Sequence, residues 1–270
     1  MGLKPVSPVG VIHTRKYDCL LYDSTSDKSV RAKRKANPAQ LAALEKSRKK
    51  QAFWAELRQW NRYEGFIYDD IAAAIQEAQR ICGNQDNYVV LDTEMTELGC
   101  HDQVIEIAIV DLTGKILIDS LVKPLEPFEI TQEALAIHKI APSMLKSAPT
   151  LSELRSQIEV VIEGKTVLAY NADLDIGMIR QSLKLEYSEK VFERTSWLYL
   201  MELYAEFCGE WSNYHKSYRW QPLYGGNHRA LGDAKAALDR LRDMAKAPIV
   251  HYPDWLIEPD ESVGVKLGKS

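Results

Sequence analysis

The chain has 270 residues, 46% of them hydrophobic and 27% charged, and it contains no internal repeat or low-complexity segment, so its composition is that of an ordinary globular protein. This length allows one sizeable domain with extensions, or two small domains. No apolar run approaches the roughly 20 residues that cross a bilayer, and the chain does not begin with a signal-peptide pattern, so we expect a cytoplasmic protein with no membrane partner.

The charge is distributed unevenly along the chain. Residues 1–60 carry 13 Lys or Arg against 5 Asp or Glu, a net +8, and the remaining residues carry 21 against 33, a net −12. The first part could therefore meet an anionic partner, whereas the acidic remainder can approach nucleic acid only where metal ions or basic patches offset its charge. The four cysteines form no CxxC pair, which predicts neither a disulfide framework nor a zinc site.

The beginning of the chain is predicted to lie outside the main domain. Residues 1–36 contain only isolated apolar residues, and we expect them to be weakly ordered. Asn37-Pro38-Ala39-Gln40 has the pattern of a helix start, with Asn as the N-cap and Gln three residues later, and a long helix is predicted to run as far as Gly65. A second helix is predicted from Asp69 to about Ile81. Residues 37–84 are thus predicted to be a helical extension.

The middle of the first predicted helix is basic and its second half is aromatic; the residues are Lys46, Arg48, Lys49, Lys50, Phe53, Trp54, Leu57 and Trp60. Such a segment could bind nucleic acid, with the Lys and Arg side chains contacting phosphates and the Trp side chains stacking on bases. Alternatively, the charges only solvate the helix while the aromatic rings pack against the main domain. The sequence leaves both interpretations open.

The pattern changes from helical to strand-like at Asn87. Strands are predicted at Tyr88–Glu94, Gln103–Val110, Lys115–Val122 and Thr166–Tyr170. Helices are predicted at Thr131–His138, Ala141–Leu145, Ser152–Glu163 with Thr150 as its cap, Asp173–Leu183, Trp197–Cys208 and His228–Ala245. Strands followed by helices that alternate with strands predict an α/β fold, in which a mixed sheet carries helices on both faces. We expect the domain to span residues 85–247 and a short tail to occupy residues 248–270.

Two carboxylates end the first predicted strand of this domain. Asp92 and Glu94 are two residues apart, so the strand period places them on the same face. Two neighbouring carboxylates repel each other unless a divalent cation or protons neutralise them. Asp175 follows a predicted strand, and Asp233 lies near the start of the last predicted helix, five residues after His228. Strand ends and helix starts are where α/β folds gather functional groups, so these five side chains could converge.

Three motifs carry these residues in order: LDTE around Asp92 and Glu94, YNADLD ending at Asp175, and HRALGD from His228 to Asp233. Together they resemble the DEDDh (DnaQ-like) family of 3′→5′ exonucleases, and the resemblance covers about residues 87–246. The segment AIHKIAPSMLKSAPT is also similar to the Ile-His-Gly-Ile stretch of the family.

The resemblance implies a ribonuclease H-like fold with a mixed five-stranded sheet. It also implies that Asp92, Glu94, Asp175 and Asp233 hold two Mg²⁺ or Mn²⁺ ions, about 3.5 to 4 Å apart, which clamp the scissile phosphate. His228 is implied to accept the proton of the attacking water as general base. From the residues alone, this histidine could merely flank the last helix.

Five further residues are candidates for contacting the substrate: Thr93, Met95, Leu98, His138 and Asn171. Thr93 points to the opposite strand face, so its backbone is the candidate group. Met95 and Leu98 could wedge beside the terminal base, or be ordinary loop residues. His138 resembles a substrate-side histidine of the family, or only packs. Asn171 is expected to orient the Asp175 loop through hydrogen bonds to nearby backbone.

The sequence also departs from the family pattern. The family commonly has Thr-Gly where this chain has Thr96-Glu97, and His and Phe where it has Tyr170 and Leu174. The segment from Tyr214 to Gly226 is short where many relatives place an additional helix. None of these changes removes a predicted metal ligand.

The sequence therefore predicts a metal-dependent 3′→5′ exonuclease that releases nucleoside monophosphates from single-stranded or frayed 3′ ends. DNA is favoured over RNA because the resemblance is strongest to DNA-directed members of the family. An RNA-trimming exonuclease is the alternative. A third hypothesis is a polymerase-associated nucleic-acid-binding module, whose N-terminal extension contacts a polymerase or another protein and whose catalysis is secondary.

Overall fold

The protein is described by a computed structural model. The structure describes residues 3–14, 16–26, 28, 30–32, 37–97, 101–183, 195–248, 250, 252 and 256. The chain divides into two compact units, one formed by residues 1–59 and 253–270 and the other by residues 60–252. The predicted functional residues all belong to the second unit.

The first unit contains short strands and most of a long helix. Strand β1 (Leu3–Pro5) pairs with β4 (Val30–Ala32), and β2 (Gly10–His13) pairs with β3 (Asp18–Leu21), both antiparallel, within the segment for which the sequence predicts weak order. Helix α1 (Pro38–Tyr63) begins at the predicted cap, because the Gln40 N–H donates to Asn37 Oδ1 over 2.7 Å and the Asn37 N–H donates to Gln40 Oε1 over 3.0 Å.

The second unit is built on a five-stranded sheet in the order β7-β6-β5-β8-β9. The strands are β5 (Tyr88–Met95), β6 (Val104–Asp111), β7 (Ile116–Leu121), β8 (Thr166–Ala169) and β9 (Ser196–Tyr199). The first three form an antiparallel meander, and β8 and β9 add in parallel to β5. The sheet is therefore mixed, as predicted.

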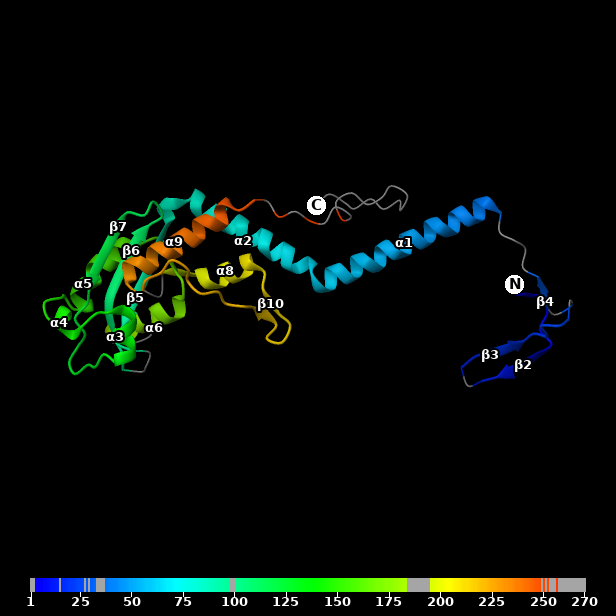
Figure 1. The fold of residues 1–270 in the computed structure, drawn as a ribbon, viewed down its shortest axis with the longest axis horizontal. Coiled ribbons are helices and arrows are strands. Elements are labelled where there is room, and N and C mark those ends of the chain that lie inside the picture. The colour runs from blue at the N-terminus through cyan, green and yellow to red at the C-terminus, as the bar shows by residue number, and fades with distance from the viewer. Residues whose placement is uncertain are drawn as a thin grey trace. The chain divides into compact units, whose positions relative to one another are not determined.

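Helices cover both faces of this sheet (Figure 1). The helices are α2 (Gly65–Gly83), α3 (Gln132–His138), α4 (Pro142–Leu145), α5 (Leu151–Ile162), α6 (Ala172–Leu183), α8 (Leu200–Cys208) and α9 (Ala230–Lys246), with a 3₁₀ turn η1 at Gln85–Asn87. Along β5, Val90 packs against α2, α8 and α9, whereas Val89 and Leu91 pack against α5 and α6. Alternate residues of β5 thus serve two separate cores.

This arrangement is the ribonuclease H-like α/β fold that the sequence predicts. The meander, the crossover through α5 to the parallel strand β8, and the helices on both faces all follow the predicted order. In the part of the chain that the structure describes, no helix is both long and apolar enough to span a membrane.

Two local predictions differ from the structure, and one pair of strands has no counterpart in the predictions. The helix predicted for Trp197–Cys208 begins only at Leu200, because residues 196–199 form β9 and pair with β8. Helix α2 begins at Gly65 rather than at Asp69. A small antiparallel pair, β10 (Trp211–Ser212) with β11 (Ser217–Tyr218), was not predicted. A short edge strand carries little periodicity of its own, so its pairing partner decides its conformation.

Candidate active site

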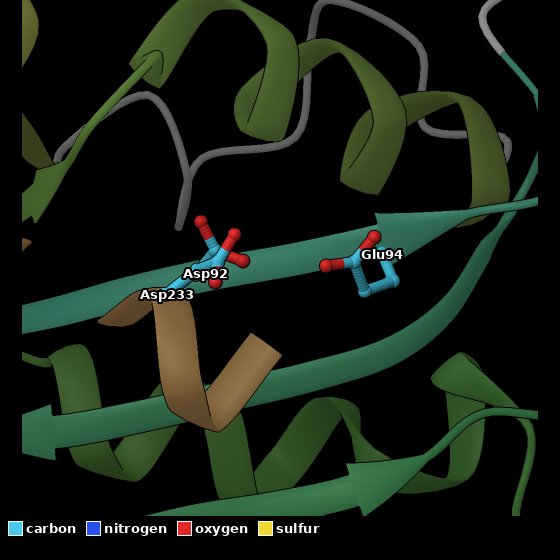
Figure 2. Close-up of side chains that lie close together, drawn as sticks. All are labelled: Asp92, Glu94 and Asp233. Atoms are coloured by element: carbon cyan, nitrogen blue, oxygen red, sulfur yellow. The ribbon is translucent and has the colours of Figure 1, made fainter. Parts of the chain in front are cut away.

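Three carboxylates meet at the end of β5. Asp92 and Glu94 project from the face of β5 that α9 covers, and Asp233 projects from the first turn of α9 (Figure 2). One oxygen from each side chain can be chosen so that all three lie within 4.8 Å of one another. The alternation of a strand, with Val90, Asp92 and Glu94 on one side, is what brings the first pair to this helix.

The electrostatics of this cluster favour a bound cation. Burial, together with the negative charges of Asp175, Asp233 and Glu94, raises the pKa of Asp92 well above its ordinary value. Burial and the charges of Asp233 and Glu106 raise the pKa of Glu94 to about 8. Among the described residues, the buried Asp92 Oδ2 has no hydrogen-bond partner. A buried, unpaired carboxylate oxygen among other carboxylates fits a hard divalent cation, so this donor set is suited to Mg²⁺ or Mn²⁺.

Asp175 is placed differently from the other three predicted ligands. It is buried in the first turn of α6, and its Oδ1 accepts a 2.6 Å hydrogen bond from the Thr93 hydroxyl, which points to the α6 face of β5. Burial raises the pKa of Asp175 to about 7, although the hydrogen bond from Thr93 opposes this rise. Asp175 is therefore not part of the three-carboxylate cluster, but its charge still acts on Asp92 and Glu94.

The loop that carries His228 is fastened to Asp233. The backbone N–H groups of Asn227 and His228 donate to Asp233 Oδ1 over 2.8 and 3.1 Å. A Cβ at Gly226 would lie only 2.8 Å from the same oxygen, so this close approach requires glycine. His228 has φ of 56° and an exposed side chain. The loop thus uses one oxygen of Asp233 to hold the backbone of His228, whose side chain lies at the surface.

Glu106 is a functional candidate that sequence reasoning missed. It lies opposite Glu94 in the β5–β6 register, and it is buried. Its carboxylate pairs with the Arg229 guanidinium and also accepts the Ala230 N–H at the start of α9 over 2.9 Å. This contact ties β6 to the helix start that presents Asp233 and His228. The available signal was a single charged residue inside the apolar run VIEIAIV, since an isolated buried carboxylate needs a partner.

The predicted substrate-contacting residues lie in different environments. Met95 packs partly against the core on the α6 side, and Leu98 lies outside the residues that the structure describes. The Asn171 backbone carbonyl accepts from the Asp175 N–H over 3.2 Å, which ties it to the Asp175 turn. Thr93 is occupied by its hydrogen bond to Asp175.

His138 is buried at the end of α3, and its Nδ1 accepts the Ile140 N–H over 2.9 Å. That bond places the proton of a neutral ring on Nε2, which is buried and has no hydrogen-bond partner among the described residues. Burial lowers the pKa of His138, and the charges of Glu106 and Arg229 also act on it. His138 thus offers a single N–H donor near the Glu106 contact.

Comparisons with known proteins identify the family of the chain. The sequence profile of the exonuclease family matches residues 89–241. The chain is 34% identical over 179 residues to the uncharacterized exonuclease CP81 of Escherichia phage 186, a match that covers 60% of this chain and 90% of that protein. It is 30% identical over 106 residues to the DNA polymerase III subunit epsilon of Pasteurella multocida, covering 36% of this chain and 41% of that protein.

Among solved structures, exonuclease X in complex with 5′ overhanging duplex DNA matches with 25% identity and a TM-score of 0.40, covering 60% of this chain and 95% of that chain. The family profile runs from β5 into α9, so it includes the three clustered carboxylates, Asp175 and His228. The chain therefore belongs to the DnaQ-like exonuclease family, and the protein is a nuclease.

Proposed function

We propose that this protein is a metal-dependent 3′→5′ exonuclease that releases nucleoside monophosphates from single-stranded or frayed DNA ends, with residues 85–247 as its exonuclease domain. The observation that carries this proposal is the cluster of Asp92, Glu94 and Asp233, in which a buried oxygen of Asp92 lacks a partner. The negative charge of such a cluster repels the scissile phosphate of a polyanionic substrate until cations neutralise it.

The residues that would hold two Mg²⁺ or Mn²⁺ ions are Asp92, Glu94, Asp175 and Asp233. When bound, the two cations would polarise the scissile phosphate, activate the attacking water and stabilise the leaving 3′-oxygen. Asp92 is the residue best placed to serve both, since the charges of Asp175 and Asp233 both act on it. Asp175 would join through the lone pairs that its hydrogen bond from Thr93 leaves free.

His228 is proposed as the general base. Its exposed side chain precedes the start of α9, and its backbone N–H donates to Asp233, which supports a role for the imidazole at the clustered carboxylates. Removing a general base typically slows hydrolysis about 10²- to 10⁴-fold. The His228→Ala variant should therefore lose activity to this extent and still bind metal.

DNA is the proposed substrate because the relatives with assigned names include a DNA polymerase III subunit. This argument is analogy, since no residue of the carboxylate cluster discriminates the sugar 2′-position. Turnover on matched DNA and RNA oligonucleotides decides the point. Faster turnover on RNA would replace this proposal with that of an RNA-trimming exonuclease.

A polymerase or another protein could bind through the N-terminal extension. Helix α2 cannot be removed to test this, because its Ala78 and Ile81 are fully buried in the core with α9. Neutralising Lys46, Lys49 and Lys50 on the exposed part of α1 to Gln is the milder test. If these residues bind nucleic acid, the triple variant should have a lower affinity for DNA, and its affinity should depend less steeply on salt concentration. Unchanged binding would leave a protein partner or simple solvation as the role of α1.

Polarity and metal dependence can be tested together. With Mg²⁺ or Mn²⁺, the protein should shorten a 5′-labelled single strand in single-nucleotide steps, whereas a 3′-labelled strand should release labelled mononucleotide at once. The Asp92→Ala variant should do neither. Release of mononucleotide from the 5′ end, or full activity of the variant, would contradict the proposal.

A further inference from the structure

The segment between β11 and His228 presents a row of exposed rings. The side chains of Trp220, Pro222 and Tyr224 are exposed, whereas Gln221 and Leu223 between them are partly buried. The two aromatic side chains keep 70% and 56% of their surface in contact with solvent. Tyr224 lies in the turn that ends the segment, where the Gly226 N–H donates to the Leu223 carbonyl over 3.4 Å. We call Trp220 and Tyr224, together with Pro222 between them, the aromatic row.

The residues between these rings hold the segment in place. The Tyr170 hydroxyl donates a 2.6 Å hydrogen bond to the Gln221 carbonyl, and Leu223 packs against the core shared by α8 and α9. Pro222 restricts Gln221 to an extended conformation. Tyr170 stands where the exonuclease family commonly has His, so this anchor comes with one of the departures of the chain from the family pattern.

The row continues directly into the candidate active site. Gly226 packs on Asp233, and the next two backbone N–H groups donate to the same carboxylate. Tyr224 is four residues before His228, so the two lie no more than about 14 Å apart, and Trp220 lies no more than about 29 Å away. Both distances lie within the length of a few nucleotides of single strand.

The charge of this segment suits a polyanion. Residues 211–232 contain Lys216, Arg219 and Arg229 but no Asp or Glu, although the chain after residue 60 carries 33 carboxylates against 21 Lys or Arg. Lys216 and Arg219 are exposed. Exposed aromatic rings in a segment that carries Lys and Arg are the combination by which proteins stack the bases and track the backbone of a single strand.

We propose that the aromatic row stacks the bases of single-stranded nucleic acid upstream of the bond to be cleaved. This inference rests on the proposed exonuclease function, because it uses the carboxylate cluster as the place where the strand ends. The row would make the enzyme favour unpaired strands, since a base can stack on a side chain only after it has left a duplex.

The test compares Trp220→Ala and Tyr224→Ala in the full-length protein on two substrates. One is a 12-nucleotide single-stranded DNA, and the other is the p-nitrophenyl ester of thymidine 5′-monophosphate, which has no upstream base. Each variant should lose about tenfold in kcat/KM on the 12-mer, mainly through KM, and less than twofold on the ester. Trp220→Phe and Tyr224→Phe, which keep a ring, should recover most of the loss.

The matched control is Tyr214→Ala. Tyr214 is more exposed, at 89%, but it belongs to the turn between β10 and β11 and not to the row. This variant should match the wild type on both substrates. An equal loss in the control would indicate a general effect of surface aromatic residues and would overturn the proposal.

Binding of the fluorescein-labelled 12-mer, measured by anisotropy without added metal, separates this inference from the proposed function. Weaker binding by the two Ala variants supports the row even if the wild type shows no turnover, a result that would overturn only the exonuclease proposal. Wild-type binding and kinetics in both variants would overturn the row and leave a protein partner as its occupant. Equal losses on the 12-mer and the ester would also overturn it.

Discussion

Asp233 and Asp175 both lie in the first turn of a helix that packs on the sheet, yet the protein holds their carboxylates differently. One oxygen of Asp233 accepts two backbone N–H groups, and its carboxylate joins the cluster with Asp92 and Glu94. Asp175 lies on the opposite face, where one of its oxygens accepts a hydrogen bond from the Thr93 hydroxyl. Position at a helix start therefore does not by itself place a carboxylate in the cluster; the groups that orient the carboxylate decide where its oxygens lie.

Replacing either aspartate by alanine tests this comparison, and it is expected to have the largest effect on turnover. Asp233→Ala and Asp175→Ala should each lower turnover about 1000-fold or more, because a lost ligand removes several kcal/mol of charge stabilisation. Only Asp233→Ala should also release the loop at residues 226–229, which hydrogen exchange would detect. Equal protection of this loop in both variants would show that Asp233 does not hold it.

Glu106→Gln tests whether the contact between β6 and the start of α9 supports the site. Arg229 and the Ala230 N–H would lose a charged acceptor, so we expect a loss of about 10- to 100-fold in activity. Because the Arg229 side chain is 41% exposed, the loss of folding free energy should be modest, about 1 to 2 kcal/mol.

The matched control for this prediction is Glu77→Gln. This variant breaks the exposed Glu77–Arg80 ion pair on α2, which lies outside the site. It should change neither activity nor stability measurably. Full activity of Glu106→Gln in a steady-state assay would show that the contact is only structural.

Thr93→Val tests how the hydrogen bond from Thr93 affects Asp175, and its expected effect is smaller. The change removes the hydroxyl that donates to Asp175 and leaves the shape of the side chain. Since this hydrogen bond opposes the rise in the pKa of Asp175, its loss should raise that pKa further and weaken metal binding about tenfold. Thr93→Ser keeps the hydroxyl and should bind Mn²⁺ like the wild type in calorimetry.

The raised pKa values predict how the metal-free protein responds to pH. Burial raises the pKa of Asp175 to about 7 and that of Glu94 to about 8 in the folded state, from about 4 in the unfolded chain. The stability that these groups contribute is therefore complete below about pH 4 and is lost as pH rises through 7 and 8. In EDTA, Tm should fall over this range, and Mn²⁺ should remove the fall. A Tm that rises with pH in EDTA would contradict these shifts.

The pairing of Asp92 with Glu94 and the general fold were predictable from the sequence for definite reasons. Asp92 and Glu94 follow an apolar run, and the period of two in a strand places them on one face without further information. The capping pattern at Asn37 and that at Thr150, where the Thr150 side chain accepts the Glu153 N–H, are local, so they predicted the starts of α1 and α5.

The features that escaped prediction depend on contacts distant in the sequence. Strand β9 is set by pairing with β8, and the role of Glu106 requires Arg229, which is 123 residues away. The difference between Asp175 and Asp233 depends on which face of β5 each helix covers, and no spacing in the sequence states this. A short strand shows too little of its own period to be separated from the helix that follows it, so residues 197–208 were predicted as one helix.

The central claim is that the clustered carboxylates hold the catalytic cations, and Mn²⁺ binding measured beside turnover tests it most directly. In calorimetry, the wild type should bind two Mn²⁺ ions per chain, and Asp92→Ala, which removes the unpaired oxygen, should lose at least one of them together with all detectable shortening of a 5′-labelled strand. An Asp92→Ala protein that binds two ions with wild-type affinity and still trims the strand would contradict the account.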